Sequence, residues 1–460
     1  MRPQTTVVFL ALAACSEAPT LYQPLSGEVF GAGEGYLNAT AIVDEWGPKM
    51  DVILPIGGFD YFNDPEALDY DSRFVYQFDV LPTSGWIDPT PWTGSYWPKN
   101  RGGIAYRWQT GEEHNFPLLD ADEAQQATLT EISQLSPAEK YDLYVGASDW
   151  PLTVSVLAAN QAGEADWAGY CHGWAPASMT YQEPSPITVV GASGVTIPFG
   201  SSDIKALLTY FEGDVSQNNH YSESQGPWAR DALTIGGNCA TEHPSDSNCY
   251  DTNPAALHVL MANRIGFQGQ SFIADVDPSP EKWNQPIHTY RSQIMAQRSP
   301  SPGAHEDALE EVVISTDLEW TVEINPQWDT AAPPSHSRTL HYSLELDASR
   351  QIIGGQWLYR LTNGEFITYH QAFGALTGWD GDGDGWADLN KAEVAHWMQE
   401  AFNVIDFAWV LRPGEFSDTF REAYSAYTFL SASPSTNAHL FDYFAKLAEL
   451  YERSTSGMNW

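Results

Sequence analysis

The sequence predicts an α+β fold, and two features along the chain predict it. Between residues 121 and 263, several segments repeat apolar residues at helical spacing, which indicates a core that contains helices. After about residue 300, short segments at 319–324, 341–346 and 352–359 are separated by Pro- and Ser-rich turns, which is typical of strands. We therefore expect a helical part and a β-rich part within one chain of 460 residues.

The expected helices have recognisable first residues. One covers 121–135, and Ser136, which stands before a proline, begins the next. Asn253 also stands before a proline and opens a helix that runs to about residue 263, with Gly266 beyond its end. The other expected helices cover 203–211, 389–408 and 438–451.

The Pro-rich stretch 299–303 marks the expected domain boundary. With 43 % apolar residues and 18 tryptophans, the chain has enough apolar surface for more than one core. We expect a core at 45–298, a β-rich region at 304–375 and a C-terminal region at 376–460. The first part of the core, to about residue 130, is turn-rich and predicts loops and short strands.

The N-terminus has the pattern of an export signal. Arg2 is followed by an apolar stretch at 7–14 and then by Cys15, and the stretch is too short to span a bilayer. Leu-Ala-Ala before Cys15 resembles the lipobox of bacterial lipoproteins, in which the cysteine is acylated. We expect an exported protein of the cell envelope or outer membrane, anchored at Cys15 through a tether at 16–44. An ordinary signal peptide that contains a cysteine is the alternative.

The charge excludes some partners. Lys and Arg number 21 and Asp and Glu number 60, so the formal net charge is 21 − 60 = −39. Nucleic acids and anionic membrane surfaces would be repelled by this charge, so we expect neither as a partner. Bound divalent cations, salty surroundings or a need for solubility are all compatible with it.

Three of the four cysteines have a plausible structural role, and one does not. Cys15 belongs to the anchor pattern, and Cys239 and Cys249 lie in a turn-rich stretch where they could form a disulfide in an oxidising compartment. Cys171 then remains unpaired, and an unpaired cysteine in an exported protein is a candidate reactive thiol. A buried, inert cysteine is the alternative.

Cys171, His258 and Asp275 form a candidate catalytic triad. Small residues such as Gly169 and Gly173 lie around Cys171, and Asp275 ends a predicted strand that begins at residue 271. A cysteine, then a histidine, then an acidic or amide residue is the chain order of papain-like and transglutaminase-like sites. In such a site the histidine takes the thiol proton and the third residue orients the histidine. Asn284 and Asp277 are rivals for the orienting role, and His258 could instead be a hydrogen-bonded core residue.

Several ordered blocks of the chain resemble the transglutaminase elicitor family of oomycetes and bacteria. The blocks cover 96–98, 101–105, 171–177, 203–207, 236–239, 253–258, 263–266, 283–287, 344–347 and 352–357. The resemblance implies a papain-like or transglutaminase-like cysteine acyltransferase core with β-rich additions. It also implies calcium-dependent acyl transfer from a glutamine side chain to a primary amine such as lysine, so the implied partners are a glutamine-bearing protein and an amine.

Residues 380–388 have the spacing of a calcium loop. Asp380, Asp382, Asp384 and Asp388 occupy positions 1, 3, 5 and 9, and Trp386 occupies position 7. Position 12 is Lys391 instead of the usual Glu, so Glu393 or another segment would have to complete the ligand shell. We expect a calcium site here, and a solvated acidic turn is the alternative.

Three functions fit these residues. The first is protein-glutamine gamma-glutamyl transfer through a Cys171 thioester. The second is a papain-like cysteine protease or amidase that uses the same three residues. The third is a non-catalytic surface binding module stabilised by calcium.

Overall fold

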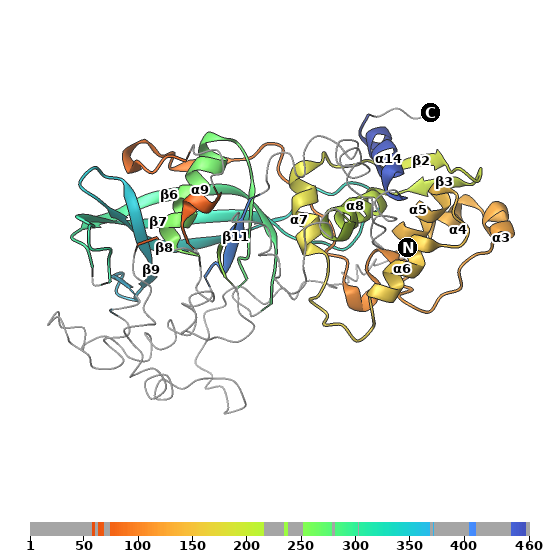
Figure 1. The fold of residues 1–460 in the computed structure, drawn as a ribbon, viewed down its shortest axis with the longest axis horizontal. Helices are drawn as coiled ribbons and strands as arrows, with labels where there is room; N and C mark the ends of the chain where they lie inside the picture. The colour runs from red at the N-terminus through yellow and green to blue at the C-terminus, as the bar shows by residue number, and fades with distance from the viewer. Residues whose placement is uncertain are drawn as a thin grey trace, which may run out of the picture.

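The computed structural model describes residues 58–59, 63–68, 74–215, 234–237, 252–277, 281–301, 303–368, 371, 404–410 and 443–456. An antiparallel sheet forms one end of the molecule and a group of helices forms the other, with helix α7 between them (Figure 1). The short 3-10 turns of the first part are η1 (Pro65–Leu68), η2 (Phe78–Val80), η3 (Lys99–Arg101) and η4 (Gly103–Ala105).

The helical end is built from short helices around an aromatic core that includes Trp97, Tyr141 and Trp174. A two-stranded hairpin packs beside α14, where the backbone N–H of Ser185 donates to the carbonyl of Ser454 (Figure 1). The elements are α3 (Ala121–Gln126), α4 (Leu129–Ser133), α5 (Pro137–Val145), α6 (Pro151–Ala159), α7 (Cys171–Thr180), α8 (Ser201–Tyr210), η5 (Phe211–Val215) and α14 (Ala445–Thr455), with the hairpin strands β2 (Ile187–Val190) and β3 (Thr196–Phe199).

Side-chain caps determine where these helices begin. Ser136 caps α5 as predicted, because its hydroxyl accepts the backbone N–H of Glu139. The prediction of one helix over 121–135 is wrong, because Thr128 is extended and caps a second helix, α4. The helix predicted at 203–211 is confirmed as α8. The one predicted to end at residue 451 runs on to Thr455.

The main sheet has the strand order β10-β9-β8-β7-β6-β5-β11-β4, and β1 pairs separately with β6. All of its pairings are antiparallel. The strands are β1 (Ser84–Trp86), β4 (Thr234–Gly236), β5 (Phe272–Ala274), β6 (Gln285–Arg298), β7 (Glu310–Thr321), β8 (Ser335–Leu346), β9 (Ile352–Arg360), β10 (Phe366–Thr368) and β11 (Phe407–Trp409).

The predicted strands at 341–346 and 352–359 lie within β8 and β9, whereas the one at 319–324 covers only the last residues of β7. The helix predicted over 389–408 is wrong at its end, because Phe407 and Ala408 pair with β4 in the sheet. The stretch 299–303 lies between β6 and β7, which pair along most of their length. The sheet therefore continues across this stretch.

Successive side chains of β5 and β11 pack alternately into two different hydrophobic cores. Ile273 and Trp409 pack into the aromatic core of the helical end. Phe272 and Ala408 pack into a second core, together with Leu257 of helix α9 (Pro254–Met261). Because successive side chains of a strand point to opposite faces, α7 and α9 lie against opposite faces of this part of the sheet.

Helix α9 packs on β8 and β9. Asn253 caps it as predicted, through the backbone N–H groups of Ala255 and Ala256. A π-helical turn, η8 (Ala262–Phe267), continues the helix, so Gly266 lies within this turn and not beyond the helix end.

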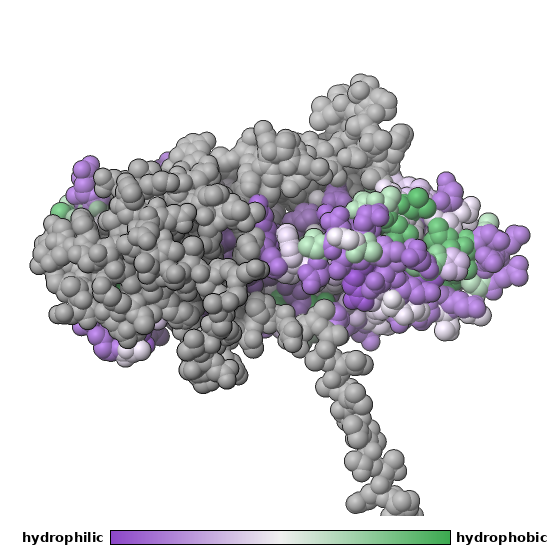
Figure 2. Space-filling view, turned by 90° about the horizontal axis from the view of Figure 1, so that it is seen from below, coloured by the Kyte–Doolittle hydropathy of each residue, from purple (hydrophilic) through white to green (hydrophobic). Residues whose placement is uncertain are grey.

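Within the described residues, no helix is long and apolar enough to cross a membrane. The face seen in Figure 2 carries hydrophilic residues over much of the helical end, with hydrophobic residues among them. Helix α6 contributes exposed apolar side chains such as Val154 to the surface.

Candidate active site

Cys171 is the first residue of α7, directly after Tyr170 at the N-cap position. A cysteine at a helix N-terminus benefits from the positive end of the helix dipole when it ionises. Position 173 requires a glycine, because a Cβ there would lie 2.1 Å from the carbonyl oxygen of Thr209 on α8. The glycine therefore lets α7 pack closely against α8.

The Cys171 sulfur is hydrogen-bonded to the segment at residues 282–284. Its S–H points to the carbonyl oxygen of Lys282 at 3.8 Å, and the side-chain amide Nδ2 of Asn284 donates to Sγ at 3.5 Å. The other end of that amide is held as well, because the indole Nε1 of Trp409 donates to Asn284 Oδ1 at 3.0 Å. Asn284 and Trp409 are both buried.

Burial keeps the thiol protonated in this arrangement. Cys171 is 5 % exposed, and burial raises the pKa of its thiol to about 12. The hydrogen bonds from Asn284 act in the opposite direction and lower the pKa. The carboxyl groups of Glu323 and Asp275 raise the pKa of Cys171 further, because negative charge nearby disfavours the thiolate.

Asp275 lies on the same side of the sheet as Cys171, directly after β5. Its carboxylate accepts the backbone N–H of Trp283 at 2.9 Å and that of Asp277 at 3.2 Å. Burial, followed by the charge of Asp406, raises the pKa of Asp275 well above its ordinary value. Asp275 thus anchors the chain segment at residues 282–284 that contacts the thiol.

His258 is not part of this arrangement. It lies on α9, where its Nδ1 is 2.8 Å from the hydroxyl of Tyr342. That hydroxyl is 2.7 Å from the hydroxyl of Thr316, which is in turn 2.8 Å from that of Ser292. Burial lowers the pKa of His258 to about 4. Because α9 packs on the face opposite α7, the structure does not bring the predicted base to Cys171.

Of the two rivals for the orienting role, Asn284 contacts the sulfur. The structure also brings Glu323 and Trp409 to the site, and sequence reasoning missed both. Glu323 follows β7, is partly buried, and accepts hydrogen bonds from Gln285 Nε2 at 3.2 and 3.3 Å. Burial raises the pKa of Glu323 to about 7. Neither residue belongs to a recognisable motif, so no local signal could have identified them.

Two aromatic side chains, Tyr96 and Trp283, pair beside the segments that hold the thiol. The rings of Tyr96 and Trp283 meet edge to face with centroids 5.4 Å apart. The carbonyl of Tyr96 accepts the backbone N–H of Tyr170 at 2.6 Å, which links this pair to the start of α7. The backbone of Lys282, which precedes Trp283, contacts the sulfur through its carbonyl oxygen.

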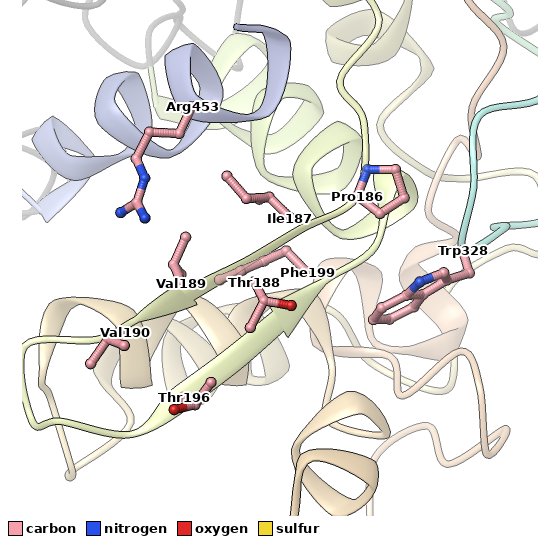
Figure 3. A pocket seen from close by; sticks show the side chains of 9 residues that line it. All are labelled: Pro186, Ile187, Thr188, Val189, Val190, Thr196, Phe199, Trp328 and Arg453. Carbon is pink, nitrogen blue, oxygen red and sulfur yellow. The ribbon is translucent and has the colours of Figure 1, made fainter. Parts of the chain in front are cut away.

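A cavity of about 700 Å³ lies elsewhere, between the β2–β3 hairpin, Arg453 of α14 and Trp328 (Figure 3). The side chains of Ile187, Val189 and Phe199 give it apolar walls. Its lining includes neither Cys171 nor the residues that contact the Cys171 sulfur. It is therefore separate from the candidate active site.

Other predicted sites fall outside the described residues. These are the anchor Cys15, the pair Cys239 and Cys249, and the calcium loop with Asp380, Asp382, Asp384, Trp386 and Asp388. Within the described residues, no group of three or more His, Cys, Asp or Glu side chains is arranged to hold a metal ion.

Comparison with known proteins supports the resemblance seen in the sequence. Residues 156–371 match the model of the transglutaminase elicitor family, and this segment contains Cys171, Asp275, Asn284 and Glu323. The fold is similar to the crystal structure of the GP42 transglutaminase from Phytophthora sojae, with a TM-score of 0.52 and 19 % sequence identity. The match covers 87 % of this chain and 99 % of that chain. No curated protein matches. The resemblance to the family and the mixed fold of helices and antiparallel sheet are thus confirmed.

Proposed function

We propose that the protein transfers the acyl group of a glutamine side chain to a primary amine through a thioester on Cys171. One observation carries the proposal: within the segment that matches the family model, a free thiol begins a helix and receives a hydrogen bond from the amide of Asn284. A thiol at a helix N-terminus with amide donors around it is the arrangement that acyl transfer to sulfur requires.

The proposed reaction has two steps. The sulfur of Cys171 bonds to the carbon of the glutamine carboxamide, and the C=O electron pair moves to the oxygen. The pair then returns, the C–N bond breaks, and the nitrogen leaves as ammonia after gaining a proton. In the second step the amine nitrogen bonds to the thioester carbon and loses a proton, and the C–S bond breaks to regenerate the thiol.

The structure corresponds to a closed resting form in this proposal. The thiol is buried and protonated, and the carbonyl of Lys282 accepts its S–H. A glutamine side chain has to displace the segment that carries Lys282 and Trp283 before its carbonyl carbon can reach the sulfur. Displacement also removes the main cause of the raised thiol pKa, which is burial.

The group that exchanges the proton with the thiol is proposed to be Glu323. Its charge acts on Cys171, and its pKa of about 7 suits proton transfer near neutral pH. Gln285, the neighbour of Asn284 in the chain, holds both oxygens of the Glu323 carboxylate. This proposal replaces His258, whose ring is bonded to Tyr342.

Calcium dependence, export with an anchor at Cys15, and a lysine-bearing protein as acceptor remain proposals based on sequence and resemblance. The acidic loop at 380–388 is the proposed calcium site.

The test is incorporation of a labelled primary amine into a glutamine-rich protein, with ammonia release measured in parallel, with and without calcium. We expect wild-type protein to incorporate the amine and Cys171→Ala to incorporate none while keeping its melting temperature. Ammonia release that does not respond to added amine would indicate an amidase, and cleavage of the protein would indicate a protease. Wild-type activity in Cys171→Ala would contradict the proposal.

A further inference from the structure

We infer that the side-chain amide of Asn284, held in orientation by the indole of Trp409, donates a hydrogen bond to the oxyanion that forms when Cys171 attacks a carboxamide. The inference rests on the proposed function, because an oxyanion arises only if the thiol attacks a carbonyl carbon. It assigns a catalytic role to Asn284 and a positioning role to Trp409.

The hydrogen bond to Trp409 determines which end of the Asn284 amide faces the sulfur. An indole N–H can only donate, so the atom 3.0 Å from Trp409 Nε1 has to be the carbonyl oxygen Oδ1 of Asn284. The NH₂ group is then directed at Cys171 Sγ, at 3.5 Å. If the amide were flipped, two N–H groups would face each other and the sulfur would lose its donor.

The position of this NH₂ group suits an oxyanion. The oxygen of the tetrahedral intermediate is two bonds from the sulfur, on the carbon that the sulfur has attacked. Nδ2 lies 3.5 Å from Sγ, so an oxygen two bonds from Sγ on the side of Asn284 can lie within hydrogen-bond distance of Nδ2. The N-terminal end of α7 begins at Cys171, so the positive end of its helix dipole also lies beside the sulfur.

The surroundings strengthen such a bond. Asn284 and Trp409 are each 8 % exposed, so little water competes for the amide. Trp409 belongs to β11, where it pairs with Ile273 of β5 and Thr234 of β4, so strands on both sides hold the indole in place. A donor fixed in advance in a dry site does not have to reorganise as charge develops.

Asn284 could instead act only on the thiolate, since its hydrogen bonds lower the pKa of the Cys171 thiol. The two roles differ in a measurable way. Alkylation of Cys171 by iodoacetamide requires the thiolate but forms no oxyanion, whereas release of ammonia from glutamine requires both. An oxyanion donor therefore affects ammonia release much more than alkylation.

The experiment measures kcat for ammonia release and the rate of Cys171 alkylation in the full chain. We expect Asn284→Ala to lower kcat about 10²–10³-fold while alkylation falls by a much smaller factor. Asn284→Leu keeps a side chain of similar shape and removes the donor without placing a charge beside the thiol, so it should lower kcat as much. Trp409→Phe should lower kcat by a smaller factor with little change in KM.

Trp357→Phe is the matched control, because the Trp357 indole donates to the carbonyl of Thr252 and not to the site, and its kcat should not change. Melting temperatures show whether each variant folds, and Asn284→Leu is used if Asn284→Ala does not fold. Unchanged kcat in the Asn284 variants, or an equal loss of alkylation and ammonia release, would overturn the inference alone. Wild-type protein that is alkylated at Cys171 but releases no ammonia would overturn the proposed function and the inference with it.

Discussion

His258 and Tyr342 form a hydrogen-bonded pair within the second core, with His258 Nδ1 2.8 Å from the Tyr342 hydroxyl. The histidine that is expected to serve Cys171 is thereby held on the other face of the sheet. Its lowered pKa of about 4 means that the imidazole is neutral at pH 7, as expected for a buried ring that bonds a hydroxyl.

We therefore expect His258→Gln to keep most of the amine-incorporating activity. The free energy of unfolding of the variant should be lower by about 1–3 kcal/mol, because the buried Tyr342 hydroxyl loses its hydrogen bond to the histidine. Tyr342→Phe, which removes the same hydrogen bond from the other side, is the control. A loss of activity beyond 100-fold at unchanged stability would restore His258 as the base.

The raised pKa of Cys171 predicts how its reactivity depends on pH. A thiol with a pKa near 12 has a small thiolate fraction at pH 7, and that fraction grows about tenfold with each pH unit. Alkylation of wild-type protein by iodoacetamide should accordingly accelerate from pH 7 to pH 10 without reaching a plateau. The rate is read from the mass of the peptide that contains Cys171. A plateau near neutral pH would show that the free protein already exposes an activated thiol.

The buried ion pair between Lys140 and Asp203 should contribute strongly to stability. Nζ and Oδ2 are 2.6 Å apart, and both side chains are fully buried. Lys140→Met leaves the Asp203 carboxylate without its cation, so we expect the free energy of unfolding to fall by about 3–5 kcal/mol. Lys446→Ala breaks an exposed pair with Glu449 and should change it by less than about 1 kcal/mol. Equal urea midpoints for the two variants would contradict this prediction.

The acidic loop at 380–388 predicts a response to calcium. A ligand that binds only the folded protein raises its melting temperature by mass action. We expect millimolar calcium to raise the melting temperature of the wild type and Asp382→Ala to lose most of that rise, because position 3 of the loop loses its carboxylate. Lys391→Ala, at the position where the usual ligand is missing, should respond like the wild type. A melting temperature that does not change with calcium would argue for a solvated turn.

Local features of the fold could be predicted from the sequence because the groups that determine them are close together in the chain. Ser136 caps the helix that begins at the next residue, and Asn253 does the same for α9. Asp275 directly follows its strand, one residue beyond the strand end. The prediction of a single helix over 121–135 failed because Thr128 caps a second helix there, despite the helical spacing of the apolar residues.

The residues around the thiol were decided by the tertiary structure. Asn284 contacts Cys171 although the two residues are 113 positions apart in the sequence, and Trp409 contacts Asn284 although they are 125 positions apart. These contacts depend on the strand order that places β11 beside β5, and on which face of the sheet each helix covers. The sequence by itself identified Cys171 as the candidate nucleophile, because that identification depends only on residue type and on spacing along the chain. Its partners depend on long-range pairing and on the alternation of side chains across a sheet, and no local pattern encodes either.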